Sequence, residues 1–236
     1  MRAAGAIARR ELAALFGEGA GWLLLGALAL VQAIHGVAFA LDERRTAEAA
    51  LAIDLHHAGY GMEIGALALV ALSARDAHAA LLWRTSAVRT GAVVAGRLAA
   101  DLGWLALAVL VSLPVPLLVA TSGAIGTGHL VAGALGLFGV GLVAVTLARA
   151  AVARLGLGGV LAAGALLGAL ELAPLAADHV PAGVRGVLSE AGPVWSHLDT
   201  LRRGVVDGAD LAFFAAIALV AVALTVAGQE ERRWGH

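Results

Sequence analysis

The feature that most constrains this chain is a set of long stretches without any charged residue. The last of them, residues 211–228, contains no acidic or basic side chain, and Arg232 and Arg233 follow shortly after it. A helix needs about 20 mostly apolar residues to cross the hydrocarbon core of a bilayer. A soluble helix of that length would carry a polar stripe, which is missing here. The stretch therefore predicts a membrane span.

The composition agrees with several such spans. Hydrophobic residues make up 61% of the 236 residues and charged residues 14%, whereas ordinary globular domains are about 25% charged. We therefore expect an all-α, polytopic membrane protein that forms one domain over residues 1–236. Its six transmembrane helices are predicted at residues 19–41, 58–74, 98–121, 130–148, 155–173 and 211–228.

The remaining segments are expected to lie at the two membrane faces. In residues 1–18, Ala8, Leu12, Leu15 and Phe16 recur at helical spacing, which predicts an amphipathic helix along the membrane surface. Residues 42–60 are expected to form an outer loop or a short helix.

Two residue patterns carry narrower predictions. Asp54, His56 and His57 should be solvated rather than bind a metal, because adjacent histidines point in different directions on a helix. Pro114 and Pro116 should kink the third span.

The basic residues, all of them arginine, indicate the orientation. With six spans, eleven of the 16 arginines fall in segments on one side of the membrane and five on the other. Because cytoplasmic loops carry the excess of basic residues, this predicts a multi-pass protein of the plasma membrane with both termini in the cytoplasm.

The same counts exclude several functions. Without lysine, the chain has no phosphate-binding loop of the GxxxxGK[ST] type, so it is not itself a P-loop ATPase. Without cysteine, it has no disulfide, thiol nucleophile or thiolate metal site. Neither HExxH nor GxSxG occurs, which argues against an intramembrane enzyme. A net charge of −1 gives no reason to expect nucleic acid.

Three stretches together resemble one family. Residues 8–12 read Ala-Arg-Arg-Glu-Leu and are followed by Phe16 and Trp22. Residues 81–90 read Leu-Leu-Trp-Arg-Thr-Ser-Ala-Val-Arg-Thr and are followed by Val-Ala-Gly-Arg at 94–97. Ahead of the last span stand Pro193, His197, Leu201, Arg203-Gly204-Val205-Val206-Asp207, Asp210 and Phe213-Phe214. In these stretches the chain resembles the membrane subunits of ABC-2 type transporters, most closely the gliding-motility-type branch.

The resemblance implies a permease subunit that moves or extrudes a substrate across the plasma membrane. ATP and Mg²⁺ would be bound by a separate ABC ATPase subunit, and a second permease chain, identical or unlike, would complete the pore. The first helix would be the family's elbow helix. A cytoplasmic coupling helix would dock on the ATPase through Arg84, Thr85, Ser86 and Arg89. An outer gate would involve Glu171, Trp195, His197 and Asp207.

Two alternatives stay open. The family usually has proline where Ala87 stands, which favours, as one alternative, a non-transporting structural or assembly subunit. A permease of the haem-exporter type is the other.

Three contacts are predicted as well. Arg97 and Asp101 are spaced to pair along one helix. Asp207 or Asp210 would cap the last helix. Gly164 and Gly168 have the small-xxx-small spacing of closely packed helices.

Overall fold

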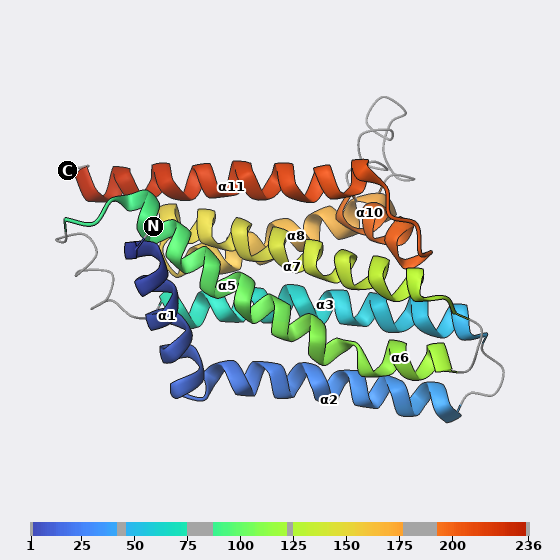
Figure 1. Cartoon of the computed structure of the whole chain (residues 1–236). Helices are drawn as coiled ribbons and strands as arrows, with labels where there is room; N and C mark the ends of the chain where they lie inside the picture. The colour runs from blue at the N-terminus through green and yellow to red at the C-terminus, as the bar shows by residue number, and fades with distance from the viewer. Residues whose placement is uncertain (1, 42–45, 75–86, 122–124, 177–192, 235–236) are drawn as a thin grey trace.

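The computed structural model describes residues 2–41, 46–74, 87–121, 125–176 and 193–234, and every regular element within these ranges is a helix (Figure 1). The helices are α1 (Arg2–Gly17), α2 (Ala20–Leu41), α3 (Ala47–Ala74), α5 (Thr90–Ser112), α6 (Pro114–Thr121), α7 (Thr127–Leu155), α8 (Gly158–Ala176), α10 (Pro193–Arg202) and α11 (Gly208–Trp234).

Four helical stretches in the described part of the chain are long and apolar enough to cross a membrane. They are Ala20–Ala38, Thr90–Thr121, Thr127–Leu155 and Gly208–Trp234. At 1.5 Å rise per residue, each reaches close to or beyond the roughly 30 Å of a bilayer's hydrocarbon core. The chain thus has the apolar helices of a multi-pass membrane protein.

Two further helices, α3 and α8, run alongside these four (Figure 1). Helix α3 carries Asp54 and Glu63, and α8 carries Glu171. Helix α3 begins at Ala47, so most of the segment expected to be an outer loop or a short helix belongs to the longer helix that contains the second predicted span. Six spans therefore remain a prediction.

Helix α7 is the centre of the bundle and packs against α3, α5, α8, α10 and α11. Its glycines make this possible, because large side chains of its neighbours occupy the space where a Cβ atom would stand. Leu55 faces Gly133, Leu198 and Leu201 face Gly136, Phe214 faces Gly139, and Leu105 faces Gly141. A Cβ atom on Gly168 of α8, in contrast, would meet nothing within 4 Å.

The predicted proline kink is a break between two helices. Helix α5 ends at Ser112, and the N–H of Leu113 donates to the carbonyl of Leu110 at 3.3 Å. Pro114 then opens α6, where its missing N–H costs no helical hydrogen bond. The third apolar stretch is therefore two helices in series.

Helix α1 crosses the long helices at the end of the bundle where α11 finishes (Figure 1). Ile7 is buried against Gly96 of α5, where an added Cβ would lie 2.7 Å from the Cβ of Ile7 and from the carbonyl oxygen of Ala4. Gly19, at φ 81°, makes the turn into α2. Phe16 and Trp22 pack across that turn with their ring centroids 4.8 Å apart.

Candidate functional site

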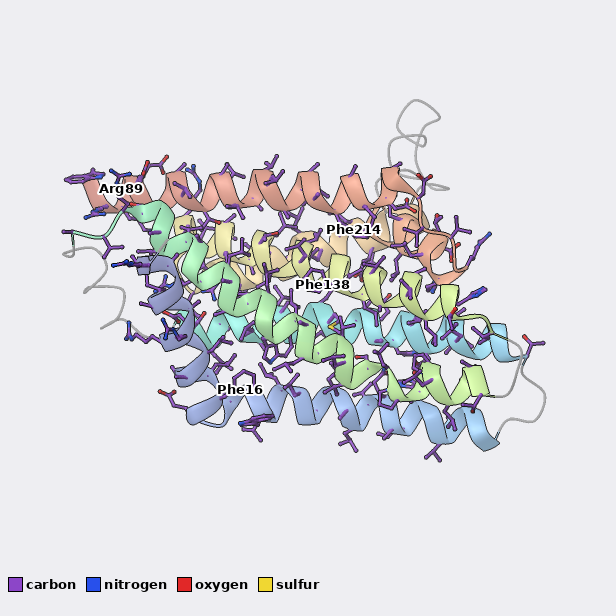
Figure 2. All side chains as sticks on the ribbon, viewed as in Figure 1. Phe16, Arg89, Phe138 and Phe214 are labelled. Atoms are coloured by element: carbon purple, nitrogen blue, oxygen red, sulfur yellow. The ribbon has the colours of Figure 1, made fainter. Side chains whose placement is uncertain are left out.

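The predicted docking residues lie partly outside the described residues, namely Arg84, Thr85 and Ser86. Arg89 is described: it is exposed and extended at the residue before α5, with φ −64° and ψ 136°. Its neighbour Val88 accepts a hydrogen bond through its carbonyl from Nη1 of Arg233 at 2.8 Å. Figure 2 shows Arg89 beside the end of α11, so the start of α5 and the end of α11 are joined at this face of the bundle.

At the opposite end, α10 is fastened to the start of α11. Nδ1 of His197 lies 2.5 Å from a carboxylate oxygen of Asp210, and the His197 ring stacks on Phe213 with 4.1 Å between centroids. Trp195, the other aromatic residue of the predicted gate, also lies in α10. The contact between His197 and Asp210 holds α10 and α11 together.

Asp207 caps α11, as the sequence suggested for one of the two acids. Its carboxylate accepts a hydrogen bond from the backbone N–H of Ala209 at 3.0 Å. The negative charge also lies at the positive end of the α11 dipole. Asp207 therefore has a local role at the start of α11.

Helix α10 carries a cluster of charges of its own. Asp199 forms ion pairs with Arg202 and Arg203. Burial acts to raise the pKa of Asp199, but the hydrogen bonds and positive charges of the two arginines hold that pKa below its ordinary value. Nη1 of Arg202 also donates to the carbonyl of Ala52 at 3.3 Å, which ties α10 to α3.

Glu171, the fourth predicted gate residue, lies in α8 and is close to a residue of α3. The carboxyl group of Glu63, which is buried, lies near that of Glu171. His56 and Tyr60, which share the face of α3 that carries Glu63, also lie near Glu171. The sequence signal for this cluster was the 56, 60, 63 spacing, one helical face.

The expectation of a solvated outer segment is wrong for Asp54. Asp54 is 3% exposed, and neither of its carboxyl oxygens has a hydrogen-bond partner among the described residues. His57 stacks on His35 of α2 with ring centroids 4.0 Å apart. Within the described ranges, no group of three His, Asp or Glu side chains is placed to hold a metal ion.

The half of the bundle that contains the start of α5 has a buried ion pair that the sequence did not predict. Asp101 of α5 accepts two hydrogen bonds from Arg149 of α7, at 2.7 and 2.9 Å. Arg97, the expected partner of Asp101, instead forms an ion pair with Glu11 of α1, with 3.6 Å between Nε and Oε1. These two ion pairs therefore link α1, α5 and α7 to one another, rather than two turns of α5.

Next to these pairs lies a cavity of about 150 Å³. It is bounded by the first turns of α5 and the last turns of α3, α7 and α11. Four arginines line it, and no acidic residue does so in the described part of the chain: Arg97, Arg149, Arg232 and Arg233.

The chain matches no known protein family, no characterised protein and no solved structure.

Proposed function

We propose that the chain is the membrane-spanning permease subunit of an ABC transporter, which moves a substrate with ATP hydrolysed by a separate ATPase. The observation that carries the proposal is the meeting of three elements at one end of the bundle. These are the transverse helix α1, the residues that lead into α5, and the arginine-bearing end of α11 (Figures 1 and 2).

An amphipathic first helix across the membrane face fits the role of an elbow helix. Its apolar residues Leu15 and Phe16 pack on the hydrophobic core, and Arg2 and Arg9 are exposed. The elbow would anchor the permease at the level of the lipid headgroups, beside the segment that contacts the ATPase.

Six membrane spans are part of the proposal. Helices α3 and α8 would complete the four longer apolar stretches, and the polar residues of α3 would face the bundle rather than lipid. The burial of Asp54 and Glu63 supports that placement, since acids at bilayer depth are costly unless they face protein or a cavity.

In this proposal the segment before α5 transmits the motion of the ATPase. Movement of residues 75–89 would act on α5, which packs on α1 and α7. Helix α7 in turn contacts most of the bundle, so a tilt of α5 would change the packing around a single central helix. A second permease chain, identical or unlike, would form the other half of the pore.

The test is copurification of an ATPase with the tagged chain from its native membrane, followed by the double variant Arg84→Glu and Arg89→Glu. We expect an ATPase in the wild-type complex and its loss from this variant, with the permease still folded. The control is Arg2→Glu with Arg9→Glu, which changes the same charge on the exposed side of α1. Equal ATPase recovery from both double variants would reject the docking assignment.

The same preparation distinguishes a transporter from the alternative of a structural or assembly subunit. ATP hydrolysis that rises when a substrate is added supports a transporter. A stable ATPase complex that no candidate substrate stimulates would favour a structural or assembly subunit.

A further inference from the structure

We propose that the joint between α5 and α6 is a hinge, and that Gln32 of α2 is the positioning residue that holds its bend. The hinge does not depend on the transport function. It is assigned from the hydrogen bonds that meet at the joint and from the packing on its two sides.

Pro116 removes a backbone donor at the joint. In a continuous helix, the N–H of residue 116 would donate to the carbonyl of Ser112, but proline has no N–H. The carbonyl of Leu110 loses its helical donor to Pro114 in the same way, and it accepts instead from the N–H of Leu113 at 3.3 Å. Ser112 is fully buried, so water does not reach its carbonyl and a donor must come from the protein.

Gln32 supplies that donor from the neighbouring helix. Its Nε2 donates to the carbonyl of Ser112 at 3.5 Å, and the residue is 2% exposed. In membrane proteins, side chains of neighbouring helices take the place of backbone donors that proline removes. The amide of Gln32 therefore replaces the N–H that Pro116 lacks, and it sets the position of the joint relative to α2.

This hydrogen bond is long, and half of the amide is unused. Hydrogen bonds from N–H to oxygen are most often about 2.9–3.0 Å long, so the contact of Gln32 is close to the limit. The Oε1 of Gln32 is buried and has no hydrogen-bond partner among the described residues. Because a buried polar atom without a partner is costly, the bend is held weakly, as a hinge requires.

Leu113 is the residue about which the two helices turn. It lies between α5 and α6 with φ −75° and ψ −28°. Just before it, Oγ of Ser112 donates to the carbonyl of Ala108 at 2.9 Å, a kind of bond that often bends a helix. Figure 1 shows α5 crossing the bundle obliquely and α6 running beside α2. Hinges commonly consist of such a residue at the end of an element.

The two sides of the joint are held unequally. Helix α5 is fixed in the core, where Trp104 is fully buried. Helix α6 has eight residues, and helices this short depend on their packing. Val115 packs at Gly36 of α2, where an added Cβ would lie 2.9 Å from Cγ2 of Val115, whereas Leu117 and Leu118 are exposed. Helix α6 is therefore the part that moves.

The test measures distances between pairs of nitroxide labels by double electron–electron resonance, on the purified full-length chain in dodecyl maltoside. The natural chain has no cysteine, so each introduced pair reports on two chosen positions alone. The hinge pair is Leu118→Cys in α6 with Leu219→Cys in α11, and the reference pair is Leu110→Cys in α5 with the same Leu219→Cys. All three positions are exposed. We expect a wider distance distribution for the hinge pair than for the reference pair.

The variants are Gln32→Leu and Pro116→Ala, with Thr146→Val as the matched control. In Gln32→Leu, we expect the minor distances of the hinge pair to become roughly fivefold more populated, as for one lost hydrogen bond, and the reference pair to stay the same. Pro116→Ala restores a backbone N–H and should narrow the hinge pair. Thr146 is also buried, but its hydroxyl donates to carbonyls of its own helix, so the control should leave both pairs as in wild type.

The double variant distinguishes a hinge from a loosened core. With Pro116→Ala in place, the carbonyl of Ser112 has a backbone donor of its own, so the addition of Gln32→Leu should change the hinge pair by less than about twofold. A general loss of packing around position 32 would act equally with and without Pro116→Ala.

Three results would overturn the hinge: a hinge pair no wider than the reference pair, no effect of Gln32→Leu on the hinge pair, or an equal effect of Gln32→Leu with and without Pro116→Ala. Pro116→Ala carries the test even if Gln32→Leu does not fold, because a hinge pair that stays as wide as in wild type would also reject the proposal.

Discussion

At the scale of single residues, the contact between Asp101 and Arg149 distinguishes this bundle from a purely apolar one. Both carboxylate oxygens of Asp101 are used, and the two side chains are 3% and 12% exposed. A pair this well buried contributes little net stability compared with apolar residues of the same volume. Loss of one partner is different, because the other charge is then left inside the bundle.

Asp101→Asn should therefore lower the free energy of unfolding by about 3–5 kcal/mol. The comparison is Glu231→Gln, which breaks the exposed pair with Arg154 and should cost at most about 1 kcal/mol. Both are measured by unfolding the purified protein in mixed micelles. Equal losses in the two variants would mean that Asp101 and Arg149 are not buried together.

The sequence could not reveal this pair. It places Arg97 and Asp101 one turn apart, and local spacing favours their pairing. The outcome depends on which helices are neighbours, because α1 brings Glu11 to Arg97 and α7 brings Arg149 to Asp101. Asp54 shows the same limit, because a charged residue in a polar stretch is predicted to be solvated as long as its neighbouring helices are unknown.

At the scale of elements, runs of apolar residues predicted most of the long helices, and Pro114 predicted the break within one of them. These features depend on the local sequence: the length of a run without charged residues, and the backbone N–H that proline lacks. The start of α3 was missed because this stretch carries polar groups such as Asp54, whose burial depends on the neighbouring helices. The sequence thus predicted which stretches form helices, but it did not predict which helices pack against each other.

The glycines of α7 lead to a prediction about packing. In Gly139→Ala the new Cβ would lie 2.8 Å from two ring atoms of Phe214. We expect about 1–3 kcal/mol of destabilisation from overpacking. Gly168→Ala meets nothing within 4 Å, so it should be neutral or stabilise by up to about 1 kcal/mol through helix propensity. Unfolding in mixed micelles measures both, and the same sign in both variants would contradict the packing around α7.

Helix α1 gives a second prediction at this scale. Gly96→Ala would force α1 away from α5, because the added Cβ meets the backbone of Ala4. The readout is maleimide labelling of Ile7→Cys, a buried position in a chain without any other cysteine. Labelling should become several-fold faster with Gly96→Ala. It should not change with Gly91→Ala, where nothing lies within 4 Å of the new Cβ. Unchanged labelling in both would mean that α1 is not held by α5.

At the scale of the whole molecule, the account depends on one face of the bundle. The cluster of arginines, the transverse helix α1 and Arg89, the docking residue that is described, all lie at the end where α5 begins and α11 finishes (Figure 1). The distribution of arginines between the two ends predicts that this face is cytoplasmic. Docking of an ATPase requires that orientation.

Cysteine labelling in intact cells tests this claim most directly, because the natural chain has no cysteine of its own. Arg89→Cys and Val205→Cys are both exposed positions, at opposite ends of the bundle. With a membrane-impermeant maleimide, we predict that Val205→Cys is labelled in intact cells and that Arg89→Cys is labelled only after permeabilisation. Labelling of Arg89→Cys in intact cells, with Val205→Cys protected, would contradict the account.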